Sequence, residues 1–363
     1  MAKPTLNDKQ RFLGLLGLSF FLLACSGPAY YLQAITGQWK LMHARQDIQM
    51  LLHHPDSNSR LVEELQTAQK IMAFAEDELG LSAAGSYTSY VDLDREALVW
   101  NVVATEEFSL QAKKWCFLVA GCVPYRGFFE QSKAEKSATH LRNKGMDVLI
   151  APAAAYSTLG WFKDPLLSTM FSGSDSRLAA YLFHELAHQR LYVKDDGQFN
   201  ESYASFVEEI GLKSWLVLNQ NLEELENWEK GQMARKEFAL LVTDLQDELG
   251  GLYRSDLTDA AKRQLKADVF NAFSLSYEQL SESNWNGKRY YANWFDQPLN
   301  NARLTLFSTY EGSHCAFQGL LEQAQGDLYE FHRLAQQKSR IDNDERQQWL
   351  NQPCTSLETA ENG

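Results

Sequence analysis

The sequence has few positive charges for its length. Its 363 residues include 34 lysines and arginines against 47 aspartates and glutamates, which gives a formal net charge of −13. Nucleic acids and anionic lipid surfaces attract proteins with basic surfaces. The composition therefore argues against a nucleic-acid partner and against an electrostatic anchor on anionic lipid, and it indicates an ordinary solvated surface.

Internal repeats and low-complexity stretches are also missing, so nothing in the sequence indicates a repeat architecture. The length is enough for one large domain or two modest ones. Hydrophobic residues make up 45% of the chain and aromatic residues 12%, which is sufficient for a sizeable core. We predict a single domain over residues 25–363, preceded by a segment, residues 1–24, that is not part of the fold.

The apolar run at residues 12–24 is shorter than the roughly 20 residues that a transmembrane helix needs, and it suits the core of a signal peptide. It ends in Leu-Leu-Ala-Cys-Ser-Gly, which resembles the lipobox of bacterial lipoproteins. The resemblance implies that Cys25 is acylated and anchors the chain in a lipid bilayer. Ser26 after it resembles the pattern sorted to the outer membrane, with the protein facing the periplasm. The alternatives are an uncleaved anchor or an ordinary signal peptide with a chance cysteine.

Cysteine is scarce, and no two cysteines form a C-x-x-C pair, which disfavours a zinc site built from thiolates. Removing Cys25 leaves four cysteines, an even number that suits disulfide bonds in an oxidising compartment. Four cysteines allow three pairings, and we favour the local ones, Cys116 with Cys122 and Cys315 with Cys354.

The hydrophobic pattern predicts an α+β fold that is mostly α, with a small β-sheet and many C-terminal helices. Helical periodicity comes first, β-rich segments follow, and nearly everything after residue 175 is helical up to about residue 350. We predict helices over 29–55, 60–80 and 131–144, a β-rich part over 86–151 that ends in a strand at 147–151, and two helices within 175–218.

The strongest chemical signal is the H-E-x-x-H pattern at residues 184–188. On a helix, positions four apart lie on one face, so His184 and His188 can direct their imidazoles to one zinc ion. Glu185 lies beside them and can act as the general base on a water molecule. Because so short a pattern also occurs by chance, a surface helix with two unrelated histidines is the alternative.

A third ligand strengthens the zinc hypothesis. The segment Asn200-Glu201 followed by Ala204 resembles the corresponding element of the aminopeptidase N-type gluzincins. That resemblance implies that Glu201 completes the metal ligands, leaving one position for water. Glu208 lies two helical turns further and could orient a ligand histidine, or lie in solvent. The gap between His188 and Glu201 is shorter than in those enzymes and requires a tight turn, for which Asp-Gly at 196–197 is suitable.

More of the chain resembles a narrower family, bacterial lipoproteins classed as aminopeptidases from their zinc motif. The resemblance implies a gluzincin-like body with one Zn²⁺ ion and a peptide substrate. The segments that carry it are 115–127, 155–162, 184–208 and 294–304.

Further residues are candidates for substrate or oxyanion binding. The segment 150–157 could form an edge strand that pairs with a peptide, with Tyr156 at its end. Arg126 could bind a carboxylate or form a structural ion pair, and Asn301 could face the site. Tyr291 and Tyr310 are candidate oxyanion donors, although packing in the core is the alternative for each. The edge segment lacks the acidic residue with which aminopeptidases hold a free amine.

The prediction is therefore a zinc-dependent peptidase, an aminopeptidase by resemblance. Three alternatives stay open. They are an envelope endopeptidase, a zinc hydrolase that acts on another bond, and an assembly lipoprotein that keeps the zinc fold without turnover.

Overall fold

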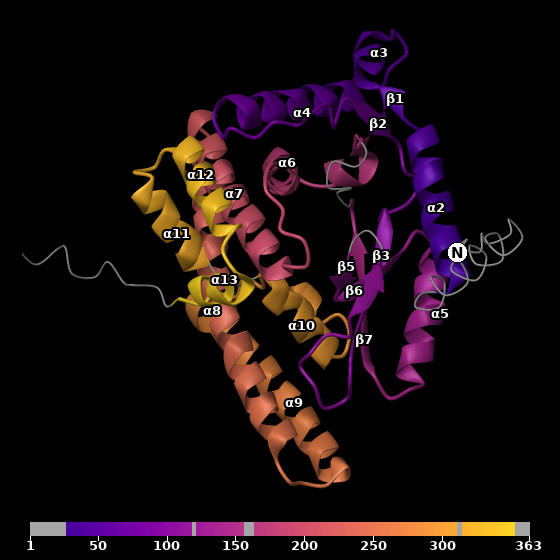
Figure 1. The fold of residues 1–363 in the computed structure, drawn as a ribbon, viewed down its shortest axis with the longest axis vertical. Helices are drawn as coiled ribbons and strands as arrows, with labels where there is room; N and C mark the ends of the chain where they lie inside the picture. The colour runs from indigo at the N-terminus through magenta and orange to yellow at the C-terminus, as the bar shows by residue number, and fades with distance from the viewer. Residues whose placement is uncertain (1–26, 118–120, 156–162, 311–313, 353–363) are drawn as a thin grey trace, which may run out of the picture.

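The computed structural model describes residues 27–117, 121–155, 163–310 and 314–352. Figure 1 confirms an α+β fold that is mostly α. The helices are α2 (Pro28–His43), α3 (Ile48–His53), α4 (Ser59–Asp77), α5 (Gln131–Arg142), α6 (Asp175–Arg190), α7 (Gly197–Leu218), α8 (Leu222–Arg254), α9 (Asp259–Asn284), α10 (Asn301–Tyr310), α11 (His314–Gln323), α12 (Leu328–Lys338) and α13 (Asn343–Leu350). The strands are β1 (Gln46–Asp47), β2 (Ser89–Val91), β3 (Val99–Thr105), β4 (Trp115–Phe117), β5 (Gly121–Val123), β6 (Tyr125–Phe128), β7 (Asp147–Ala153) and β8 (Leu166–Leu167).

The first predicted helix is divided. Helix α2 ends at His43, and α3 begins at Ile48 after the short strand β1. Asp47 causes the new start, because its carboxylate accepts hydrogen bonds from the backbone N–H groups of Gln49 and Met50. The predicted helix at 131–144 is α5, and Gly145 follows it with a φ of 77°, the left-handed conformation that commonly ends a helix.

The sheet β6-β3-β7 is antiparallel and separates two packed layers (Figure 1). Side chains alternate between its faces. One face carries Val102, Phe128 and Val148 and is covered by α5. The other face carries Val103 and Leu149 and is covered by α10. The sheet therefore has one side toward α2 and α5 and one side toward the helical body.

A two-stranded hairpin, β4-β5, carries the disulfide between Cys116 and Cys122, which confirms the local pairing predicted for these residues. Cys315 is also disulfide-bonded. Its predicted partner, Cys354, lies outside the described residues, as does Cys25, so both of those predictions stand untested.

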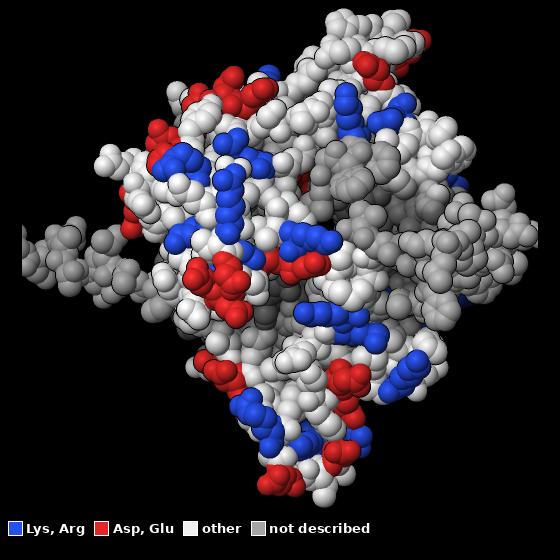
Figure 2. Space-filling model, viewed as in Figure 1, with Lys and Arg blue, Asp and Glu red and all other residues white. Residues whose placement is uncertain are grey.

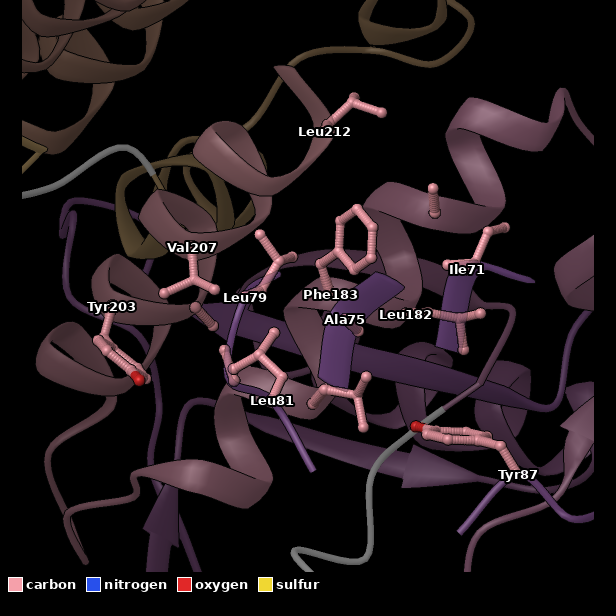
Figure 3. Packing of buried hydrophobic residues seen from close by; sticks show 14 of the residues in the cluster. Ile71, Ala75, Leu79, Leu81, Tyr87, Leu182, Phe183, Tyr203, Val207 and Leu212 are labelled. Atoms are coloured by element: carbon pink, nitrogen blue, oxygen red, sulfur yellow. The ribbon is translucent and has the colours of Figure 1, made fainter. Parts of the chain in front are cut away.

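The main core joins α4, α6, α7, α11 and α12. Figure 3 shows Ile71 and Ala75 of α4, Phe183 of α6 and Val207 of α7 in one layer. Phe183 and Tyr203 are fully buried, and burial of one large apolar side chain is typically worth about 1.5–3 kcal/mol. This core fixes α6 against α7, the two helices on which the zinc hypothesis depends.

The hairpin of α8 and α9 has its own aromatic core and projects from the body (Figure 1). On the face in Figure 2, acidic and basic side chains are interspersed along it and across the helical body. Within the described ranges, no helix has the length and apolar character to cross a membrane.

Candidate metal centre

Helix α6 presents both histidines of the motif on one face. It begins where the Ser174 hydroxyl accepts a hydrogen bond from the backbone N–H of Arg177, at 3.3 Å. Leu178, Leu182 and Leu186 are buried on its apolar side. The packing of that side against the main core sets the direction in which the histidines point.

Asn200, the residue that precedes Glu201, holds the turn between α6 and α7. The Asn200 side chain accepts a hydrogen bond from the Val193 N–H and donates one to the Val193 carbonyl, both at 2.7 Å. Asn200 is almost fully buried, so these bonds are shielded from water. Asp196 caps α7 by accepting from the Phe199 N–H at 3.0 Å. The short connection thus brings Glu201 back to the histidines.

The disulfide hairpin touches the same turn. Asp195 has a φ of 62°, and its carboxylate accepts a hydrogen bond from the Cys122 N–H at 3.3 Å. A Cβ atom at Gly121 would lie 1.9 Å from that carboxylate, so only glycine fits there. The β4-β5 hairpin and the turn between α6 and α7 therefore stabilise each other.

His184, His188 and Glu201 converge in the way a metal ion requires. The two Nε2 atoms lie 3.1 Å apart, and Glu201 oxygens lie 3.4 Å from His184 Nε2 and 3.7 Å from His188 Nε2. Zinc at about 2.0–2.1 Å from tetrahedral ligands would place those ligands about 3.3 Å apart. The three groups could hold a metal ion, since one ligand atom of each lies within 4.8 Å of the others.

The protonation of these residues agrees with a site for a cation. Burial lowers the pKa of His188 to about 4. Burial also opposes protonation of His184, but hydrogen bonds to Glu201 and Glu208 outweigh it and raise the pKa to about 10. A proton on His184 therefore gives its imidazole a positive charge next to the Glu201 carboxylate. A bound metal cation would provide positive charge at the same place.

Glu208 accepts a hydrogen bond from the other ring nitrogen of His184. Its Oε2 lies 3.0 Å from His184 Nδ1. This contact leaves Nε2 free to act as a ligand and fixes the ring orientation. Glu208 therefore has the orienting position that its spacing from Glu201 predicts.

Glu185 lies beside the three ligands with its carboxylate out of water. Its side chain is only 8% exposed. Burial raises the pKa of Glu185 to about 7, against the opposing effects of His184 and of a hydrogen bond from Tyr181. One of its oxygens, Oε2, is buried without a hydrogen-bond partner in the described part of the chain. A carboxylate with this pKa can accept and release a proton near neutral pH.

Tyr125 is a functional candidate that the sequence analysis missed. Burial raises the pKa of Tyr125 to about 12, and the carboxylates of Glu201 and Glu185 contribute. The rise reflects burial first and nearby negative charge second, and the hydroxyl stays protonated at neutral pH. The Tyr125 side chain lies on the same face of the sheet as Val103 and Ala151.

Arg126, the residue predicted from the same segment, lies on the opposite face. Its register partner in β3 is Val102, which faces α5, whereas the partner of Tyr125 is Val103. The guanidinium lies 4.0 Å from the ring centroid of Tyr30 in α2. The structure therefore does not bring Arg126 to the metal ligands, because adjacent residues of a strand point to opposite sides.

Two other predicted residues lie in structural networks. The Asn301 side chain accepts from the Tyr253 hydroxyl at 2.7 Å and donates to the Glu107 carbonyl at 3.0 Å, which ties α10 to α8 and to the chain after β3. Tyr291 stacks on Phe238 at 3.9 Å in the core of the α8–α9 hairpin. Neither joins the metal ligands.

The last two candidates are only partly placed. Tyr310 is the final residue of α10, a helix that packs against α7. Its side chain and the whole of Tyr156 lie outside the described part of the protein, so their roles remain predictions.

The geometry agrees with a comparison against known families. The family described as "Putative aminopeptidase" matches residues 29–350. The chain belongs to this family. No curated protein and no solved structure matches it. Membership in this family supports a peptidase that acts on peptides. The family description names neither a metal nor a mechanism.

Proposed function

We propose that this protein is a zinc-dependent peptidase in which His184, His188 and Glu201 hold one Zn²⁺ ion and Glu185 is the general base. The observation that carries the proposal is the convergence of three ligand atoms at 3.1–3.7 Å beside a buried carboxylate. Imidazole and carboxylate ligands with tetrahedral spacing favour zinc among common metals. When bound, zinc would supply Lewis acidity that polarises a peptide carbonyl and lowers the pKa of water.

The protein groups supply the rest of the chemistry. Glu185 accepts a proton from the attacking water and delivers it to the leaving amine, a sequence that its pKa of about 7 supports. Glu208 keeps the His184 ring in one orientation. Tyr125 donates a hydrogen bond to the oxyanion that develops on the scissile carbonyl.

In this proposal strand β7 would align the substrate. It pairs with β3 on one side, and no other strand of the described chain pairs with its second side. An extended peptide can add to such an edge through main-chain hydrogen bonds. At the end of the strand, Ala153 and Ala155 pack against the core that contains α6. A peptide on this edge would therefore lead toward the ligand helix.

The anchor is part of the proposal. Acylation of Cys25 would place the body directly beside a bilayer, because α2 begins at Pro28. The protein would then act as an outer-membrane lipoprotein on peptides in the periplasm.

A peptide screen tests the function. Wild type and Glu185→Gln, each with measured zinc content, are incubated with a mixed library of free and N-acetylated peptides. We expect the wild type to cleave and Glu185→Gln to bind zinc but lose about 10²–10⁴-fold in activity, which is the usual contribution of a general base. Loss of cleavage after N-acetylation identifies an aminopeptidase, and retained cleavage an endopeptidase. Zinc binding without any cleavage by wild type would refute the peptidase proposal and favour the assembly lipoprotein.

A further inference from the structure

A cavity lies on the side of the sheet away from the candidate metal centre. It has a volume of about 810 Å³ and lies between α2, β6 and the start of α5. In Figure 1, α2 and α5 lie one above the other on the right-hand side of the sheet. Since α10 and Tyr125 face the other side of the sheet, this cavity is separate from the peptidase site.

The cavity is basic in an acidic protein. Two acidic side chains line it, Asp92 and Glu130, and Glu130 is already paired with Lys133 at 2.8 Å. The five cationic side chains of its lining are Lys40, Arg95, Arg126, Lys133 and Lys136. With a net charge of −13 for the whole chain, this local excess of positive charge is opposite to the average surface.

Arg126 lines this cavity, and no acidic side chain of the described residues pairs with it. Its Nε is buried without a hydrogen-bond partner, and no carboxylate in the described ranges pairs with its guanidinium. The ring of Tyr30 lies against its face at 4.0 Å. An unpaired buried donor is costly. An anion in the cavity would pair with the partly exposed guanidinium, whose planar shape suits a phosphate or carboxylate.

An exposed apolar stripe borders the cavity. Leu32, Ile35 and Trp39 of α2 are 66%, 65% and 58% exposed, and their spacing of three and four residues puts them on one face of the helix. Leu32 also lines the cavity. A ligand that used both surfaces would have an anionic group next to an apolar body. Helix α2 starts three residues after Cys25, the predicted acylation site.

We propose that the cavity binds the phosphate of an anionic phospholipid through Arg126, Lys40 and Lys136, while Leu32, Ile35 and Trp39 contact its acyl chains. A headgroup of glycerophosphate size fits a cavity of this volume. The net charge of the protein disfavours general attraction to anionic lipid, so binding depends on this local cluster. The proposal is independent of peptidase activity.

Binding of short-chain lipids tests the site without interference from a bilayer anchor. The full-length protein in neutral detergent is titrated with dihexanoyl-phosphatidylglycerol, with dihexanoyl-phosphatidylcholine and with inorganic phosphate, each monomeric, and binding is followed by Trp fluorescence and calorimetry. We expect the phosphatidylglycerol to bind saturably. The phosphatidylcholine and inorganic phosphate should bind at least about tenfold more weakly, which corresponds to about 1.4 kcal/mol of binding free energy.

Variants assign the binding to the cavity. Arg126→Gln and, separately, Lys136→Gln should each weaken phosphatidylglycerol binding by about tenfold, because each removes a charge-assisted contact. Arg142→Gln is the matched control, since Arg142 is exposed at the end of α5 outside the cavity lining. Unchanged binding in both cavity variants, or equal binding of phosphatidylcholine, would overturn the proposal. If inorganic phosphate bound as tightly as the phosphatidylglycerol, the ligand of the cavity would be a free anion and not a lipid. Thermal unfolding of each variant shows whether Arg126→Gln folds, and Lys136→Gln keeps the test valid if it does not.

Discussion

The Nδ1 atom of His184 lies 3.0 Å from the Glu208 carboxylate, one helix away and 24 positions along the chain. This contact links Glu208 to the candidate metal centre, although Glu208 is not among the three residues proposed as ligands.

Glu208→Gln should weaken zinc binding by about 10–100-fold, because loss of an outer-shell carboxylate typically has that effect on metal affinity. The measurement is zinc affinity by competition with a chromophoric chelator. Glu223→Gln, in the exposed first turn of α8, is the control and should leave the affinity unchanged. A Glu208→Gln protein with wild-type affinity would show that Glu208 does not orient His184.

Tyr125→Phe should lower kcat of the proposed peptidase by about 10²-fold, with a much smaller change in KM, because the hydroxyl stabilises charge that develops only in the transition state. Steady-state kinetics on a peptide cleaved by the wild type measures both constants. Tyr329→Phe makes the same chemical change on an exposed tyrosine of α12 and should have no effect. A rise in KM alone would instead make Tyr125 a substrate-binding residue.

Arg346→Met should lower the free energy of unfolding by about 3–5 kcal/mol, because it leaves the Asp196 carboxylate buried and unpaired. Arg346 Nε lies 2.6 Å from Asp196 Oδ2, and the two side chains are 7% and 3% exposed. Urea denaturation measures the change. Arg333→Met breaks the exposed pair with Glu330 and should cost far less. Equal losses in the two variants would contradict a special role for the buried pair.

His332 should make the fold sensitive to acid. Burial, with a smaller effect from the charge of Arg190, lowers the pKa of His332 to about 4. The Tyr203 hydroxyl lies 2.7 Å from its Nδ1, and its Nε2 lies 2.9 Å from the Leu79 carbonyl, so the neutral ring satisfies both contacts.

The sign of the effect follows from that lowered pKa. An unfolded histidine has a pKa near about 6.5, so the folded state binds fewer protons between pH 6.5 and 4. The contribution of His332 is complete above that window and is lost as the pH falls, by at most about 1.4 kcal/mol per pH unit. Urea denaturation from pH 7.5 to 4.5 should show a smaller slope for His332→Gln than for wild type. The exposed His140→Gln should keep the wild-type slope, and an unchanged slope in His332→Gln would contradict the assignment.

The sequence was sufficient for features that depend on local spacing. The pairing of His184 with His188 follows from helical spacing, and Glu201 follows from the resemblance of its segment to that of the gluzincins. The structure brings the three side chains together. The α5 boundary follows from Gly145. Such features depend only on residues that lie within a few helical turns of one another along the sequence.

Features that depend on distant partners could not be read in this way. Choosing Tyr125 over Arg126 requires knowing which face of β6 meets the helical body, and that is decided by the register with β3. Asn301 has the composition of a site residue, but its contacts with Tyr253 and Glu107 come from segments far along the chain. A strand alternation argument could have offered Tyr125 as an equal candidate, but not selected it.

The bond between Arg346 and Asp196 also has a consequence for the order in which the protein is made. Asp196 caps the helix that carries Glu201, and its partner in α13 lies 150 positions later. The ribosome therefore translates the three residues of the proposed metal site long before Arg346. Until α13 is made, the turn between α6 and α7 has the hydrogen bonds of Asn200 and Asp196 but lacks the ion pair with Arg346.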